Sequence, residues 1–267
     1  MPRFVASVQY DGSRYHGWQS LKTGHPSVQE TVEKALSKVA NHSVSVVCAG
    51  RTDAGVHGCN QIIHFDSDAE RSSYGWTFGT NSGLPDDIAL NWVQPVSDDF
   101  HARFSAEWRR YRYVILNRRI RPAHLPKGVT YYHRPLDVEL MNIGGQYLIG
   151  EHDFDSYRAV QCQAKHAVRE MQKLEVHRHG DMVIIDIRAN AFLHHMVRNI
   201  TGVLQEVGSG RKPPIWVKEV LDARDRSKAG VTAKPHGLYF VDVGYPEQFD
   251  LPKSEPNPFF VAAALPW

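Results

Sequence analysis

The N-terminal part of the chain switches repeatedly between the spacing of strands and the spacing of helices, and this limits the fold to a mixed α/β class. Arg3 to Tyr10 alternates in the manner of a half-buried strand. Ser27 and Glu30 form a capping box, and the apolar residues after it recur at helical spacing. Runs at 43–48 and 61–65 predict two strands around a polar turn. This order suits a sheet with helices on one side better than a doubly wound nucleotide fold.

The second half of the chain shows the same mixture of strand and helix patterns, although no fixed-period repeat relates the two halves. His179-Gly180-Asp181 predicts a hairpin turn. Further strands are expected at 111–116, 171–178, 182–189 and 238–243, and helices at 138–149, 191–207 and 215–225. We therefore expect two α/β domains, 1–106 and 107–267, that meet across a cleft, a common place for a site.

Composition excludes several classes of protein. Of the 267 residues, 42% are hydrophobic and 22% charged, values typical of a globular chain. The longest apolar run, Phe259 to Leu265, is far shorter than the roughly 18 residues of a membrane span. No secretory leader is expected at the start. Three cysteines without a C-x-x-C pair argue against a disulfide framework or zinc, so we expect a cytoplasmic protein.

Cofactor motifs are missing from the sequence. There is no G-x-x-x-x-G-K-[ST] loop and no G-x-G-x-x-G after a strand, so nucleotide cofactors are not expected. Adjacent helical positions such as His194 and His195 diverge by about 100°, and no H-E-x-x-H pattern surrounds them. We expect no metal and no cofactor.

Arginines and aromatic residues are concentrated in one segment, although the net charge is only +2. Seven arginines lie between Arg103 and Arg121, opposed only by Glu107 and interleaved with Trp108, Tyr111 and Tyr113. Guanidinium groups match phosphates, and aromatic faces accept bases, so the segment suits RNA. A solvated, arginine-rich strand and loop explains the same pattern equally well.

The turn from Ala49 to Gly58 holds three glycines, Arg51, Asp53 and His57. Glycines allow unusual backbone angles and close approach of a ligand. A guanidinium two residues before Asp53 would favour the ionised carboxylate, which could then act as nucleophile or base. The alternative is an Asx turn with a structural ion pair, and elementary physics favours that alternative.

The predicted helix 191–207 places His194 and Arg198 four residues apart on one face. A positive charge on that face could hold a phosphate, or could pair with a surface acid.

The loop Gly50-Arg51-Thr52-Asp53-Ala54-Gly55-Val56-His57 resembles that of the pseudouridine synthases. Other segments resemble the same family in the same order and extend the likeness from about Arg3 to Leu251. They are Tyr10-Asp11-Gly12, Gly17-Trp18-Gln19, Asp99 to Phe104, Arg110 to Tyr113, Phe154 to Tyr157, Phe192 to Asn199 and Gly237-Leu238-Tyr239.

The resemblance implies two similar mixed α/β domains that form an extended sheet around a central, positively charged cleft. It implies a homodimer that isomerises uridine to pseudouridine at positions 38, 39 and 40 of the tRNA anticodon stem–loop, without cofactor or metal. By the same likeness, Asp53 matches the catalytic aspartate and Tyr111 a substrate-contacting tyrosine. Arg51 and Arg198 match active-site arginines, and Leu238 matches an apolar residue near the target base.

The resemblance predicts that the basic residues form a track that binds the phosphates of the tRNA backbone. The affinity for tRNA should then fall as the salt concentration rises. The track is the arginine-rich segment from Arg103 to Arg121, in particular Arg103, Arg109, Arg110 and Arg112, along with Arg14, Lys22, Arg158 and Lys165.

Two other functions remain open. A non-catalytic RNA-binding protein would use the same track, with Asp53 as a turn cap. A carboxylate-based nucleosidase or glycosidase would need a second acid facing Asp53, and the nearby sequence offers only Asp66 and Asp68.

Overall fold

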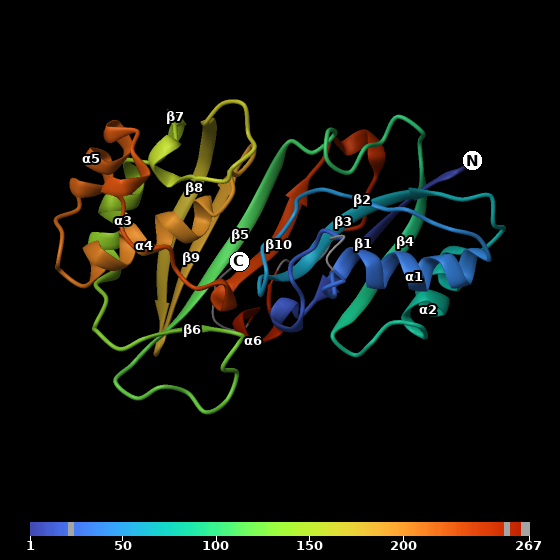
Figure 1. The fold of residues 1–267 in the computed structure, drawn as a ribbon, viewed down its shortest axis with the longest axis horizontal. Coiled ribbons are helices and arrows are strands. Elements are labelled where there is room, and N and C mark those ends of the chain that lie inside the picture. The colour runs from blue at the N-terminus through green and yellow to red at the C-terminus, as the bar shows by residue number, and fades with distance from the viewer. Residues whose placement is uncertain (21–23, 254–256, 263–267) are drawn as a thin grey trace. The chain divides into compact units, whose positions relative to one another are not determined.

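The computed structural model describes residues 1–20, 24–253 and 257–262 (Figure 1). By packing, the chain divides into two compact units. The first comprises Met1–Glu107 and the chain from Tyr239 to α6 (Phe259–Ala262), and the second comprises Trp108–Leu238. The predicted second domain, 107–267, includes a last strand that packs instead with the first unit. The mixed α/β class is confirmed.

The first unit is built on a sheet whose strands follow the order β4-β1-β3-β10, with β2 paired to β3. β1 is antiparallel to both of its neighbours, whereas β10 runs parallel to β3 and places Tyr239 opposite His57. The strands are β1 (Arg3–Tyr10), β2 (Val47–Cys48), β3 (His57–Asp66), β4 (Ile88–Val96) and β10 (Leu238–Gly244).

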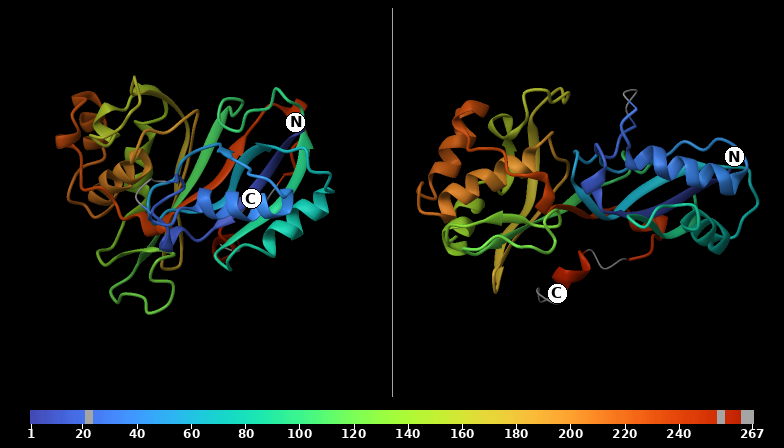
Figure 2. Two further views of the ribbon diagram at one scale, coloured as in Figure 1. Left: turned by 45° about the vertical axis from the view of Figure 1, so that its right-hand side comes forward. Right: turned by 60° about the horizontal axis from the view of Figure 1, so that its bottom comes forward.

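Two helices, α1 (Val28–Ala40) and α2 (Ser73–Asn81), lie side by side in this unit (Figures 1 and 2). As predicted, α1 begins where Ser27 Oγ accepts a hydrogen bond from the Glu30 amide, at 3.2 Å. The helices and the sheet share one apolar core. It includes Phe4, Ala6, Val8 and Tyr10 of β1, Val32 and Leu36 of α1 and Trp76 of α2. The predicted buried face of β1 is thereby confirmed.

The ten strands form a single mixed sheet, and the strands of the second unit follow the order β5-β9-β8-β7, with β6 parallel to β5. Its strands are β5 (Trp108–Asn117), β6 (Thr130–Tyr132), β7 (Gly150–Asp153), β8 (Val168–His179) and β9 (Met182–Ala189). Its helices are α3 (Val138–Gln146), α4 (Met196–Gly208) and α5 (Trp216–Ala223). The predicted β8–β9 hairpin is confirmed, and Gly180 closes it with φ +54°.

Two differences from the sequence prediction affect the site. β3 begins at His57 rather than at 61, because residues that look like turn formers pair with β1: Gly58 lies opposite Tyr10. The helix predicted from 191 begins only at Met196, because His195 takes a left-handed backbone conformation with φ +61°. His194 therefore lies outside α4, and its predicted helical spacing from Arg198 is wrong.

Among the described residues, no helix has the length and hydropathy of a bilayer span.

Candidate active site

The loop that carries Asp53 connects β2 to β3 and rests on the segment that follows β1. The Trp18 amide donates to the carbonyl of Thr52 at 3.0 Å, and the Gly55 amide donates to the carbonyl of Tyr15 at 3.3 Å. The hydroxyls of Tyr10 and Thr52 form a buried hydrogen bond of 2.8 Å. These bonds of the first unit hold the backbone on both sides of Asp53.

Two glycines of the supporting segment are required by sterics. A Cβ on Gly12 would lie 1.9 Å from the carbonyl oxygen of Val56. A Cβ on Gly17 would lie 2.6 Å from the carbonyl oxygen of Thr52, and the Gly17 backbone is left-handed with φ +95°. Only glycine tolerates such an approach without displacing the backbone. The motifs Tyr10-Asp11-Gly12 and Gly17-Trp18 thus pack against the loop that carries Asp53 and support its backbone.

His57, the first residue of β3, stands at the end of the loop that carries Asp53. Its ring is buried and stacks on Tyr239 of β10, with centroids 4.6 Å apart. His57 Nδ1 lies 3.1 Å from the Asp11 carboxylate, and this hydrogen bond holds the pKa of Asp11 below its usual range. The last strand of the chain therefore supports the end of the loop.

Asp53 itself is half-buried, whereas Arg51 is exposed. The effect of the Arg51 guanidinium on the ionisation of Asp53 stays a prediction.

Tyr111, Arg198 and Leu238 all belong to the second unit. Tyr111 is buried on β5, where its ring meets the edge of Phe192 with centroids 5.0 Å apart. Arg198 stands on the first turn of α4, and its Nε donates to the carbonyl of Ala233 at 2.8 Å. Leu238, buried at the start of β10, follows a turn whose Lys234 carbonyl accepts a hydrogen bond from Tyr113 of β5, at 2.6 Å.

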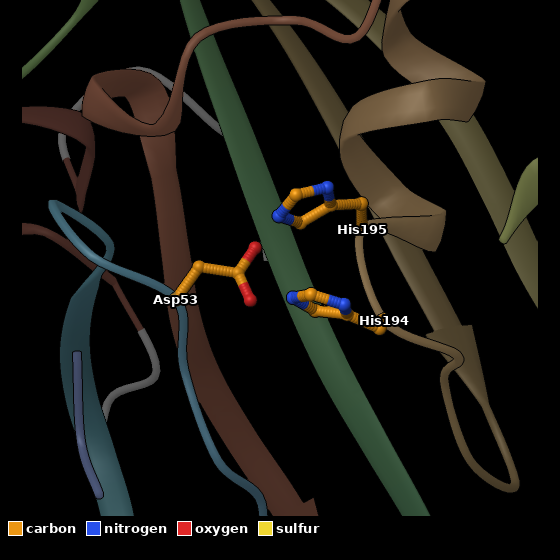
Figure 3. Close-up of side chains that lie close together, drawn as sticks. All are labelled: Asp53, His194 and His195. Carbon is orange, nitrogen blue, oxygen red and sulfur yellow. The ribbon is translucent and has the colours of Figure 1, made fainter. Parts of the chain in front are cut away.

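Figure 3 draws Asp53 on its loop in the first unit and His194 and His195 on the segment that leads into α4 of the second. The left-handed backbone at His195 starts α4 without a side-chain cap. This abrupt start places Arg198 in the first turn of the helix.

The sequence did not reveal the residues that hold this end of α4. Asn199 is fully buried, and its amide donates to the carbonyl of Tyr157 at 2.8 Å. Its Oδ1 accepts from the Thr232 hydroxyl at 2.7 Å and from Arg226 at 3.1 Å. In the sequence, the segments around Tyr157 and Asn199 both stood out as motifs. No spacing rule connects either motif to residues 226–232.

The predicted RNA track divides into buried and exposed arginines. Arg110 donates to both oxygens of the buried Asp186, at 2.7 Å through its Nε, and Arg112 Nη2 lies 3.4 Å from the same carboxylate. Burial alone would raise the pKa of Asp186, but these guanidinium groups hold it below its usual range. Arg112 is only 3% exposed, so the structure does not support a surface phosphate contact for it.

The other predicted track residues differ in their surroundings. Arg109 is half-buried and donates to the carbonyl of Asn190 at 3.0 Å. Arg14 and Arg103 are exposed, and Arg14 lies 3.3 Å from Asp87. Lys22 lies outside the described residues.

Comparison with known proteins decides the family. The family profile described as tRNA pseudouridine synthase matches residues 6–105 and 145–246. The chain belongs to this family. The tRNA pseudouridine synthases isomerise uridine to pseudouridine in tRNA, so the chain is an isomerase that acts on tRNA. The family likeness seen in the sequence is confirmed.

Close relatives share nearly the whole chain. The protein of Escherichia fergusonii named tRNA pseudouridine synthase A is 55% identical over 260 residues, which cover 97% of this chain and 96% of that protein. The protein of the same name from Vibrio vulnificus is 56% identical over 259 residues, covering 97% and 98%. A solved Cbf5-Nop10-Gar1 complex aligns at a TM-score of 0.37 and 12% identity over 89% of this chain and 49% of that chain, too slight a likeness to bear on the fold.

Proposed function

We propose that this tRNA pseudouridine synthase modifies positions 38, 39 and 40 of the anticodon stem–loop, with Asp53 as its catalytic group. We propose further that it acts as a homodimer in the cytoplasm. The observation that carries the catalytic assignment is the build of the Asp53 loop. Hydrogen bonds from Trp18 and Gly55 and the close approach of Gly12 and Gly17 hold the backbone around the half-buried Asp53 in place.

The reaction breaks the N1–C1′ glycosidic bond and forms a C5–C1′ bond, while a proton leaves C5 and N1 gains one. A carboxylate serves both routes to bond cleavage. Asp53 can attack C1′ to form a glycosyl ester, or it can remove a sugar proton to give a glycal. Either way the detached uracil must rotate before it rejoins the sugar, and an enclosed site prevents its loss.

The second unit offers groups suited to hold the uridine. Moving a base out of a paired stem costs a few kcal/mol of stacking free energy. Stacking of the base on an aromatic side chain offsets part of that cost. We assign this role to Tyr111, with Leu238 as an apolar neighbour of the base. Arg198 supplies a positive charge held by the Ala233 carbonyl. Exposed Arg51 is assigned to displacing the base from its stack.

The test is release of tritium from unmodified tRNA that carries ³H at C5 of uridine. Wild-type enzyme should release tritium, and Asp53→Asn should reduce the rate at least 10³-fold while leaving tRNA affinity within about 3-fold. Asp68→Asn is the matched control, because Asp68 is an exposed aspartate of the same unit. It should react like wild type.

Other outcomes would identify the competing functions. Bound tRNA without release from any variant would indicate an RNA-binding protein in which Asp53 caps a turn. Free uracil as the product, together with loss of activity in Asp68→Asn, would indicate a nucleosidase with paired carboxylates.

A further inference from the structure

Phe104 is exposed to an unusual degree for a residue in a firmly anchored loop. Its side chain is 76% exposed, in the segment between β4 and β5. An exposed phenylalanine gains nothing from hydrophobic burial within its own chain. Its position must therefore be explained by what surrounds it and by what it can contact.

The loop beneath Phe104 is fixed from several sides of the first unit. Phe100 is fully buried against the rings of Tyr245 and Phe249, at 5.0 Å from each. The Ala102 amide donates to His64 Nδ1 at 3.1 Å, and the Ala102 carbonyl accepts from the Tyr245 hydroxyl at 2.6 Å. These contacts leave the backbone before Phe104 little freedom.

His101 fixes the orientation of the Phe104 backbone. Its Nδ1 accepts hydrogen bonds from the amides of Arg103 and Phe104, both at 3.2 Å. The imidazole then lies against Phe104, with ring centroids 4.3 Å apart and planes 30° from parallel. The Arg103 guanidinium carbon lies 5.6 Å from the centre of the Phe104 ring. These three residues form a cluster of rings and a guanidinium at the surface, which we call the Phe104 platform.

We propose that the Phe104 platform stacks an unpaired nucleobase of the tRNA substrate, with the adjacent phosphate held by Arg103. The proposal rests on the tRNA substrate of the proposed function but not on the role of Asp53. An imidazole and a guanidinium beside an exposed ring suit a π-system that is bonded to a phosphate. They do not suit an apolar protein partner, which would have to desolvate the arginine. The platform lies outside the residues assigned to the target uridine, so it contacts a different base.

The experiment compares tRNA binding by three substitutions of Phe104, each in the Asp53→Asn background so that no turnover occurs. Loss of one stacked base costs about 1–3 kcal/mol, equivalent to a rise in Kd of about 5- to 150-fold. Phe104→Ala and Phe104→Leu should show this rise, and Phe104→Trp should bind within about 2-fold of the parent because it keeps a flat π-face. Phe78→Ala is the matched control, because Phe78 is 57% exposed on α2 and stacks on Tyr74. It should leave Kd unchanged.

Irradiation of the complex at ultraviolet wavelengths gives a second readout, which does not depend on affinity. A nucleotide adduct should appear on the peptide that contains Phe104 and should disappear in Phe104→Ala. Equal Kd for the alanine variant and its parent, equal affinity of Leu and Trp, or no adduct on this peptide would overturn the proposal. Release of tritium by Asp53→Asn would instead count against the catalytic assignment and leave the platform unaffected.

Discussion

At the scale of single residues, His64 shows how a polar side chain can be part of a core. It is 5% exposed on β3, and its Nδ1 accepts the Ala102 amide hydrogen. Burial lowers the pKa of His64 to about 4, with a smaller contribution from the charge of Arg3. The ring is therefore neutral at physiological pH, as its role of acceptor requires.

This histidine gives the protein a defined sensitivity to acid. Because the folded-state pKa lies below the unfolded value of about 6.5, its contribution to stability is complete above pH 6.5 and is lost as pH falls toward 4. His64→Asn keeps an acceptor near the Ala102 amide but does not titrate. In urea unfolding followed between pH 7.5 and pH 4.5, the wild type should lose about 2 kcal/mol more than His64→Asn. Parallel pH profiles for the two proteins would contradict this assignment.

The sequence identified the Asp53 loop because its glycines and charged residues are contiguous. It did not predict the partners of those residues. Tyr10, Gly17 and Tyr239 meet the loop through tertiary packing, which no local pattern encodes. The spacing of Arg51 and Asp53 also does not say how far each side chain is buried: Arg51 is exposed and Asp53 is half-buried.

At the scale of elements, the start of α4 depends on the chain that crosses it. The segment before β10 approaches the helix backbone so closely that a Cβ on Gly202 would lie 1.9 Å from the Val231 carbonyl oxygen. Two residues further on, Ala233 exchanges backbone and side-chain hydrogen bonds with Arg198. The glycine thus sets the distance between the crossing segment and the arginine.

Although Gly202→Ala adds only one methyl group, we expect it to impair catalysis. The added methyl group must displace residues 230–233, and the Ala233 carbonyl that holds Arg198 moves with them. We expect a loss of about 1–3 kcal/mol in unfolding free energy and a fall in kcat of at least 10-fold in the tritium assay. In the control Gly83→Ala, the new Cβ would meet no atom nearer than 3.6 Å, so its kcat should equal that of wild type. Equal kcat in Gly202→Ala would show that the crossing segment does not position Arg198.

Most elements could be predicted from periodicity, and the failures have specific causes. The apolar pattern from residue 191 is helical, but a left-handed backbone at His195 delays the helix by five residues. α2 was not predicted, because two glycines and no aliphatic side chain within it hide its helical character. Side-chain spacing reports which face is buried and does not report where the backbone turns.

At the scale of the whole molecule, the arginines differ in their surroundings. Arg112 lies directly opposite Asp186 across β5 and β9, inside the second unit. Arg14 and Arg103 are exposed, and we expect them to contact tRNA phosphates. The segment that looked uniform in sequence is therefore divided by the alternation of strand β5 and by the loop before it.

The salt dependence of tRNA binding should separate these groups. Affinity should fall steeply between 50 and 200 mM salt, and Arg103→Ala should reduce the slope of log K against log salt by about 1. Arg112→Ala should leave the slope unchanged but lower the unfolding free energy by about 2 kcal/mol, because Asp186 loses a buried partner. A flat salt response of the wild type, or equal slopes for Arg103→Ala and wild type, would contradict the surface track.

The return of β10 to the first unit also has a consequence during synthesis. The strand leaves the ribosome only after the 131 residues of the second unit, which takes about 7 to 26 seconds at ordinary translation rates. Until then β3 lacks its parallel neighbour and His57 lacks the ring of Tyr239. The nascent enzyme therefore carries Asp53 long before the loop around it is complete.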